Sequence, residues 1–158
     1  MTSLILPNLY IGTADTAKFG LNQYDLIINC TKNIPNPLPL PDSMKCDNQD
    51  YSKNAKFFRI PVDDLPEDSD ILLEYLPNIT EKIHNSRLNN EKILIHCRQG
   101  VSRSCTVLAA YLLRYHNYSV EQVINFIKEK RPHAFFIEVR FKHVLEEFKQ
   151  TIFNTISL

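Results

Sequence analysis

The sequence predicts a single α/β domain over residues 1–158, in which a central, mainly parallel or mixed β-sheet of four to five strands is flanked by α-helices. Short apolar segments of strand length alternate along the chain with longer segments of helical periodicity. The 158 residues, 44% of them hydrophobic, suffice to bury one sizeable core. The sequence contains no internal repeat or low-complexity tract, so nothing divides it into further units.

Four apolar segments have the length of buried strands, and each is bounded by residues that favour turns. Between the second and the third, residues 31–56 are expected to be mostly loop because Pro35, Pro37, Pro39 and Pro41 block regular structure, with one short strand near 44–47. The four predicted strands are 9–12, 25–30, 57–60 and 92–96.

Helical segments follow these strands. The Ser-Val-Glu-Gln sequence at 119–122 is a capping box, and Arg131-Pro132 stops the helix that it opens. Pro77 should break or kink the helix that contains it. The predicted helices are one or two turns at 13–18, then 70–86, 103–116, 119–130 and 138–153.

Composition excludes several classes of protein. The formal net charge is zero, so we expect no nucleic-acid partner. No apolar run has membrane-spanning length and the N-terminus lacks a basic signal region, so we expect a soluble, cytoplasmic protein without a membrane partner. The four cysteines lack metal-ligand spacing, which predicts neither a metal site nor a disulfide scaffold. The oligomeric state stays open.

The sequence His-Cys-Arg-Gln-Gly-Val-Ser-Arg-Ser at 96–104 joins the last predicted strand to the helix at 103–116. The first turn of a helix has backbone N–H groups without partners, and its dipole favours an anion. A phosphate would therefore be held by backbone rather than by a metal. The expected phosphate-binding residues are Arg98, Gln99, Gly100, Val101, Ser102 and Arg103.

Within this segment, four side chains have predicted roles. The helix field lowers the pKa of a thiol, so Cys97 should be a thiolate nucleophile, and the planar guanidinium of Arg103 can grip two phosphate oxygens. Ser104 can donate to the sulfur when the thiolate departs, and His96 supports the segment at the strand end. A buried structural thiol with a surface arginine is the alternative, but motif and strand–helix context occur together here.

The pattern His-Cys-x5-Arg-Ser is the signature of cysteine-dependent protein phosphatases, and its Gly-x-Ser-Arg-Ser ending resembles the dual-specificity branch. Residues 5–12, 27–31 and 109–113 also resemble segments of that family. The resemblance implies hydrolysis of phosphotyrosine and phosphoserine or phosphothreonine through a cysteinyl-phosphate, with a phosphoprotein as partner and no cofactor.

The resemblance also indicates a proton donor. Dual-specificity phosphatases carry their general acid in Ile-Pro-Val-x-Asp, which residues 60–64 match, so we expect Asp64 to protonate the leaving oxygen. The adjacent Asp63 is the alternative. A loop at a strand end can place an acid over a pocket, but Asp68 and its neighbours are also good helix N-caps and need no further role.

The chain departs from the family at two places. Gln99 stands where many members have alanine. After Arg131-Pro132 many members have a Pro-Asn segment whose asparagine braces the phosphate loop, and residues 133–138 lack it, so the brace must come from elsewhere or be missing. Phe135 and Phe136 could line a substrate pocket, although core packing is the commoner role for such a pair.

Cys30 ends a strand that should run parallel to the one before Cys97, which would place both cysteines at one sheet edge. A second thiol there could trap an oxidised Cys97 as a disulfide, an arrangement that some dual-specificity relatives resemble. Burial statistics favour the alternative, an inert buried cysteine.

Three functional classes follow. The leading one is an active protein phosphatase. The same chemistry on a phosphoinositide or an RNA 5′ end is second, and Arg98 as the only basic residue between Cys97 and Arg103 argues against a lipid. A silent phosphoprotein binder is third. Silent relatives usually lose the cysteine, the arginine or the acid, whereas this sequence keeps all three.

Overall fold

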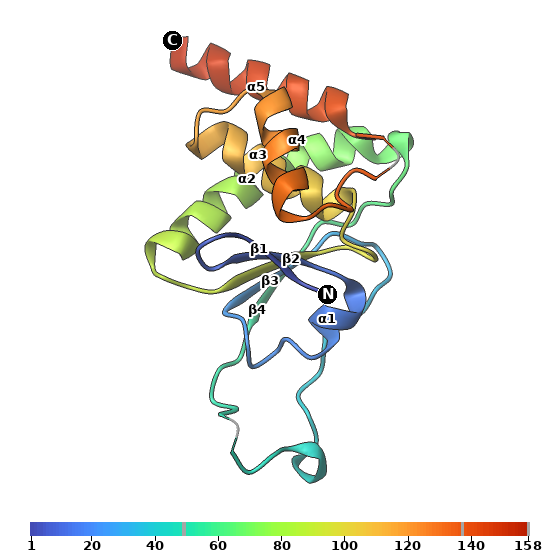
Figure 1. The fold of residues 1–158 in the computed structure, drawn as a ribbon, viewed down its shortest axis with the longest axis vertical. Helices are drawn as coiled ribbons and strands as arrows, with labels where there is room; N and C mark the ends of the chain where they lie inside the picture. Colours follow the sequence, from blue (N-terminus) through green and yellow to red (C-terminus); the bar gives the residue numbers. More distant parts are fainter. Residues whose placement is uncertain (49, 137, 158) are drawn as a thin grey trace.

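A computed structural model describes residues 1–48, 50–136 and 138–157 of the chain. In this part of the chain five strands form one sheet, in the order β1-β2-β5-β3-β4 (Figure 1). The sheet class therefore matches the prediction. The strands are β1 (Ser3–Leu6), β2 (Leu9–Gly12), β3 (Leu26–Asn29), β4 (Lys56–Arg59) and β5 (Ile93–His96).

The strands β2, β3, β4 and β5 run parallel to one another, and the edge strand β1 pairs antiparallel with β2. Gly12 and Asn29 both lie opposite His96, and Arg59 lies opposite Asn29. The carboxyl ends of the parallel strands therefore end level, at one edge of the sheet, where α/β proteins place their sites. The sequence did not predict β1, which the turn at Asn8 (φ 65°) folds back from β2.

The helices α2 (Ser69–Leu88), α3 (Arg103–Tyr115), α4 (Val120–Lys130) and α5 (Lys142–Ser157) cover one face of the sheet (Figure 1). Alternate strand residues such as Ile28 and Ile95 enter the core beneath them. Ile27 and Leu94 point to the opposite face, where they pack with Ala17 of the short helix α1 (Ala14–Lys18). Within the described chain α3 contacts each of the other three large helices and is buried over most of its length.

The capping box predicted at Ser119 is observed, and Thr13 forms a second one that the sequence analysis did not predict. The Thr13 and Ser119 side chains each accept a hydrogen bond from the backbone N–H three residues later, and their own backbone N–H groups donate to the side chain of that residue, which completes two capping boxes. Arg131 adopts an extended backbone and ends α4 before Pro132.

Of the two outcomes predicted for Pro77, a break or a kink of its helix, the structure excludes the break. α2 is helical from Ser69 to Leu88 with Pro77 inside it. The Pro77 carbonyl accepts a bond of 2.6 Å from Arg114 Nη1 of α3, and the Thr80 hydroxyl donates to the Leu76 carbonyl at 2.7 Å. The N–H that proline lacks would have bonded the carbonyl four residues earlier, and contacts with α3 hold the helix in place despite this loss.

One predicted strand is absent from the structure, and one predicted helix begins later than expected. Residues 44–47 do not form a strand: the long connection from β3 to β4 contains instead a short 3-10 helix, Asp42–Met44, and extends away from the sheet in Figure 1. The last helix begins at Lys142 rather than at 138, because Glu138 and Arg140 lie in the preceding turn, where Arg140 contacts the loop after β4.

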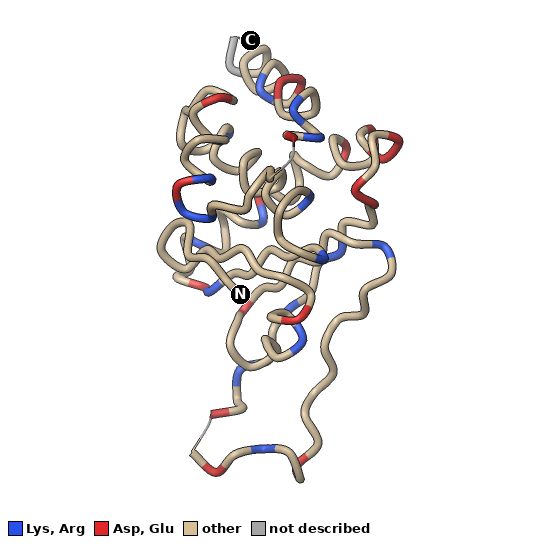
Figure 2. Tube along the Cα trace, turned by 45° about the vertical axis from the view of Figure 1, so that its right-hand side comes forward, with Lys and Arg blue, Asp and Glu red and all other residues tan. Residues whose placement is uncertain are grey.

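Lys and Arg are interspersed with Asp and Glu along the trace and do not gather into one basic face in the view of Figure 2. Among the described helices, none combines the length and the apolar character needed to cross a bilayer.

Candidate active site

Cys97 follows β5 directly and opens a loop, residues 97–102, which we call the phosphate loop; it leads into α3 at Arg103. The thiol is almost fully buried at the bottom of a cavity of about 260 Å³. That cavity is lined by Asp64, Cys97, Arg98, Gln99, Val101, Ser102 and Arg103. The structure thus brings the predicted nucleophile, arginine and acid to one place.

The carbonyl groups of four consecutive phosphate-loop residues are all bound from outside the loop. These bonds occupy the carbonyls and hold the loop in one conformation, as a preorganised anion site requires. The pairs are Ala14 N to Arg98 O (3.0 Å), Arg131 Nη2 to Gln99 O (3.3 Å), Arg131 Nε to Gly100 O (2.7 Å) and Phe135 N to Val101 O (2.7 Å).

The buried Arg131 and the segment after it therefore brace the phosphate loop here, where many relatives use an asparagine. Arg131 also donates to Ser3 Oγ at 2.8 Å, which ties the loop to β1. Nothing in the local sequence around Cys97 indicates this contact, because Arg131 lies at the end of α4.

Glycine is required at position 100 both by the backbone conformation and by the lack of room for a Cβ atom. Its φ of 68° lies in the left-handed region, and a Cβ at this position would lie 2.6 Å from the Gly12 carbonyl oxygen and 2.7 Å from Arg131 Nη2. The phosphate loop therefore packs directly against the carboxyl end of β2 and against its own brace.

Burial by itself raises the pKa of the Cys97 thiol. Hydrogen bonds from the hydroxyl and backbone N–H of Ser104, the charge of Arg103 and the Gly100 N–H outweigh it, so that the net pKa lies below the usual range of a thiol. The Ser104 Oγ lies 3.3 Å from Cys97 Sγ. Ser104 is thus placed where it can stabilise a thiolate.

The Arg103 guanidinium is anchored on one side and open on another. Its Nη1 donates to the Val62 carbonyl at 3.0 Å, whereas its buried Nε has no hydrogen-bond partner among the described residues. Buried donors without partners are rare and costly. A tetrahedral anion in the cavity would supply the missing acceptor.

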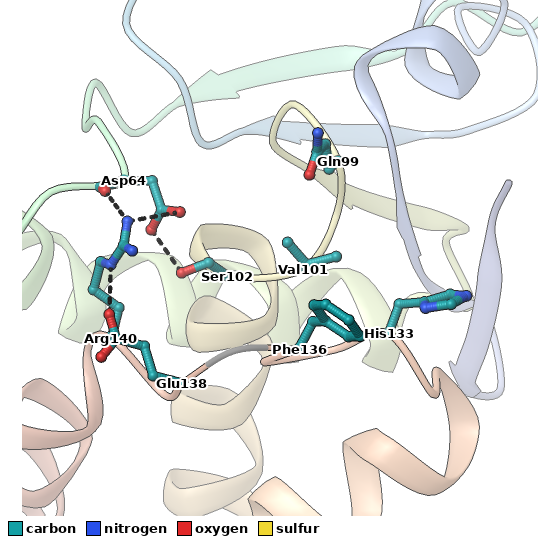
Figure 3. Close-up of a pocket in the computed structure, with 8 residues that line it drawn as sticks. All are labelled: Asp64, Gln99, Val101, Ser102, His133, Phe136, Glu138 and Arg140. Atoms are coloured by element: carbon teal, nitrogen blue, oxygen red, sulfur yellow. Dashed lines mark hydrogen bonds and ion pairs between the residues drawn. The ribbon is translucent and has the colours of Figure 1, made fainter.

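Asp64 is fixed by contacts from two sides (Figure 3). The Ser102 hydroxyl donates to its Oδ1 at 2.7 Å, and Arg140 Nη1 lies 3.3 Å from its Oδ2 and donates to its backbone carbonyl. The loop after β4, residues 61–68, is called the acid loop below. It is thus joined to the phosphate loop through the carboxylate that lines the cavity.

Asp63 is held elsewhere. Lys32 Nζ lies 3.3 Å from the Asp63 carboxylate and 3.1 Å from that of Asp68, and Asp68 also accepts the Asp63 N–H at 2.6 Å. Asp68 stands at the N-cap position of α2 but caps no backbone N–H of the helix with its side chain. It orders the acid loop instead.

A second cavity of about 430 Å³ adjoins the first and shares Asp64, Gln99, Val101 and Ser102 with it (Figure 3). His133, Phe136, Glu138 and Arg140 form the rest of its lining. The two phenylalanines considered above have separate places. Phe135, at φ 55°, enters the core, and Phe136, 74% exposed, lines this cavity.

His96 and Cys30 lie beneath the site and are fully buried. Burial lowers the pKa of His96, whose Nδ1 lies 3.2 Å from the Cys97 carbonyl oxygen, so a neutral ring that donates to this carbonyl fits the position. The Cys30 N–H donates to the His96 carbonyl at 2.8 Å, which places Cys30 beside Cys97 on the neighbouring strand. Burial and the neighbouring Cys97 raise the pKa of the Cys30 thiol.

Comparisons with known proteins agree with this architecture. Residues 9–151 match the family model described as the dual specificity phosphatase, catalytic domain. The chain is 36% identical to the "Putative tyrosine phosphatase 123R" of Invertebrate iridescent virus 6, covering 85% of each chain. It is 31% identical to human dual specificity protein phosphatase 16 over 81% of this chain, but spans only 18% of that protein.

Solved structures share the fold. The crystal structure of human DUSP28 superimposes with a TM-score of 0.76, at 23% identity, over 96% of this chain and 94% of the other. The structure of DUSP15 gives a TM-score of 0.70 at 28% identity, over 99% of this chain and 94% of the other. The family match extends over most of the chain and includes the loop that holds Cys97 and Arg103. The chain belongs to the dual-specificity phosphatase family.

Proposed function

We propose that the protein is a dual-specificity protein phosphatase, which hydrolyses phosphotyrosine and phosphoserine or phosphothreonine esters through a cysteinyl-phosphate. The observation that carries the proposal is the convergence of Cys97, Arg103 and Asp64 on one cavity above a braced loop. An intact nucleophile, anion grip and acid argue for an enzyme rather than for a silent binding module.

In the first step the Cys97 thiolate attacks phosphorus, an S–P bond forms and the bond to the leaving oxygen breaks. Asp64, in its acid form, gives its proton to that oxygen. Arg103 binds two phosphate oxygens through both states, and its unpartnered Nε fits this role.

In the second step Asp64, now a carboxylate, takes a proton from water while the water oxygen attacks phosphorus. The S–P bond breaks, inorganic phosphate leaves, and the Ser104 hydroxyl stabilises the returning thiolate from 3.3 Å. No other proton donor is needed, because Asp64 returns to its acid form at the end of the cycle.

Phosphoproteins are the favoured substrate class. Arg98 is exposed at the rim of the cavity and is the only basic residue between Cys97 and Arg103, which suits one phosphate ester better than a polyphosphorylated headgroup. The exposed ring of Phe136 in the adjoining cavity offers an apolar contact to an aryl ester such as phosphotyrosine.

Under one set of conditions, hydrolysis of phosphotyrosine and phosphothreonine peptides should be compared with that of a phosphoinositide and an RNA 5′-triphosphate. We expect turnover of both peptides and loss of all turnover in Cys97→Ser. Turnover that survives this change would overturn the mechanism, and turnover of only the lipid or only the RNA would move the substrate to that class.

The role of Cys30 as a redox partner stays a prediction. Peroxide would oxidise the Cys97 thiolate to a sulfenic acid, and attack by the Cys30 thiol would form a disulfide and release water. Peptide mapping after mild oxidation should find a Cys30–Cys97 bridge in the wild type and in Cys105→Ser, whose thiol is also buried near Cys97. A bridge absent from both proteins would make Cys30 an inert core residue.

A further inference from the structure

Arg140 reaches the acid loop from the turn before α5, a part of the chain to which neither the motif nor the proposed mechanism gives a role. Its Nη1 contacts Asp64 twice, at the backbone carbonyl and, at 3.3 Å, at the carboxylate oxygen Oδ2. Its Nε lies 3.3 Å from Glu138 Oε1, which holds the other end of the guanidinium (Figure 3). The contact joins residues 76 positions apart in sequence.

As a carboxylate, Asp64 is therefore held at both oxygens, because Ser102 donates to Oδ1 at 2.7 Å. In the acid form the bond from Arg140 to the Asp64 backbone carbonyl remains and still fixes the residue. A proton donor works only within hydrogen-bond reach of the leaving oxygen, and small displacements are costly in rate. An ion pair whose side chains are about one third exposed adds little to folding stability. A fixed direction of the carboxylate is thus the main consequence of this contact.

We propose that Arg140 is a positioning residue, which holds Asp64 over the phosphate loop in the orientation needed for proton transfer. The inference rests on the proposed function of Asp64 as the acid. It goes beyond that function, because it makes the turn before α5 part of the device that sets the rate for substrates with poor leaving groups.

The test uses two substrates that differ in their need for a proton. p-Nitrophenolate is a weak base and needs a proton less than the more basic phenolate of phenyl phosphate does. Arg140→Gln should lower kcat/KM about tenfold on phenyl phosphate and less than about threefold on p-nitrophenyl phosphate. Arg140→Lys keeps the charge but has one nitrogen in place of the two that contact Asp64 and Glu138, so it should give a ratio between those of the wild type and Arg140→Gln.

Two controls separate positioning from structure. In an Asp64→Asn background, Arg140→Gln should cause no further loss on phenyl phosphate, since the group that it positions is gone. Arg114→Gln is the matched control: Arg114 binds the Pro77 carbonyl and Thr80 Oγ1 on α2, so its loss should change the melting temperature and leave the substrate ratio unchanged.

An equal loss on both substrates, or the same loss with and without Asp64, would overturn the inference. If Arg140→Gln does not fold, Arg140→Lys decides, and a wild-type substrate ratio in that variant would overturn it. A wild type without turnover that depends on Cys97 would contradict the proposed function. An active enzyme in which the ratio of kcat/KM between the two substrates is the same with and without Arg140 would contradict only this inference.

Discussion

The phosphate loop and the acid loop meet at one cavity but are held there by different means. In the phosphate loop four consecutive carbonyls are bound by backbone N–H groups and the buried Arg131. The acid loop is held by hydrogen bonds such as that from Ser102 to Asp64, and in addition by ion pairs of partly exposed side chains, such as Lys32 with Asp63, at 38% and 45%. The loop of the proposed nucleophile is therefore held by buried backbone geometry, whereas the loop of the proposed acid also depends on contacts that salt and pH can weaken.

The largest effect should come from Gly100→Ala in the phosphate loop. The new Cβ would meet the Gly12 carbonyl oxygen and Arg131 Nη2 at a positive φ, so the phosphate loop must shift. We expect kcat/KM to fall about 100-fold or more. The steady-state rate on p-nitrophenyl phosphate measures it, with Gly20→Ala, outside both cavities, as the control. Wild-type turnover in Gly100→Ala would show that the loop tolerates displacement.

Arg131→Gln should be the next largest. Loss of the guanidinium frees the Gly100 and Gln99 carbonyls, and we expect about a tenfold fall in kcat/KM and a loss of about 2 to 3 kcal/mol in the free energy of unfolding. Urea unfolding and initial rates give the two numbers. Arg87→Gln, which removes a bond to the Tyr111 hydroxyl on the α2–α3 interface, should change stability without changing kcat/KM. Equal activity losses in both variants would contradict the brace.

Ser104→Ala should shift the pH profile. The Ser104 hydroxyl helps to lower the pKa of Cys97, against the effect of burial, which raises it. Loss of the hydroxyl should therefore raise this pKa. The thiolate is the reactive form, so the acid limb of kcat/KM should move to higher pH, with about a tenfold lower rate on the acid side. Initial rates measured from about pH 4.5 to about pH 8 would reveal the shift. An unmoved limb would exclude Ser104 from thiolate stabilisation.

The smallest effect should be that of Asp68→Ala in the acid loop. The Asp63 N–H and then Lys32 lower the pKa of Asp68, so its stabilisation is present above the ordinary carboxyl value of about 4 and is lost as pH falls through the depressed value. We expect a cost of about 1 kcal/mol at neutral pH, which vanishes in strong acid. Urea unfolding at several pH values measures this cost. Asp42→Ala, whose partner Lys45 lies on the exposed connection, should cost less at neutral pH.

The same contrast explains what the sequence could predict. Cys97, Arg103 and Ser104 were predictable because their motif lies within eight residues, between a strand and a helix whose periodicities are plain. The choice of Asp64 over Asp63 rests on a family pattern, since adjacent acids look alike in sequence; in the structure Asp64 lines the cavity and Lys32 binds Asp63.

Long-range partners were not predictable. Arg131 looked like a helix terminus and Arg140 like part of a helix, because their contacts with the two loops join segments 32 and 76 residues apart. Pro77 favours a helix break by a local rule, yet its helix continues through it and contacts α3 there. Sequence periodicity reports local structure, and tertiary contacts decided these positions.

The unpartnered Nε of Arg103 also has a thermodynamic consequence. An empty site leaves a buried donor unsatisfied, and the folded protein bears that cost until an oxyanion arrives. Because only the folded chain assembles this site, phosphate, tungstate or vanadate should raise the unfolding free energy by about 2.7 kcal/mol at a hundredfold excess over Kd. The melting temperature thereby reports site occupancy even in Cys97→Ser, where no turnover remains to be measured.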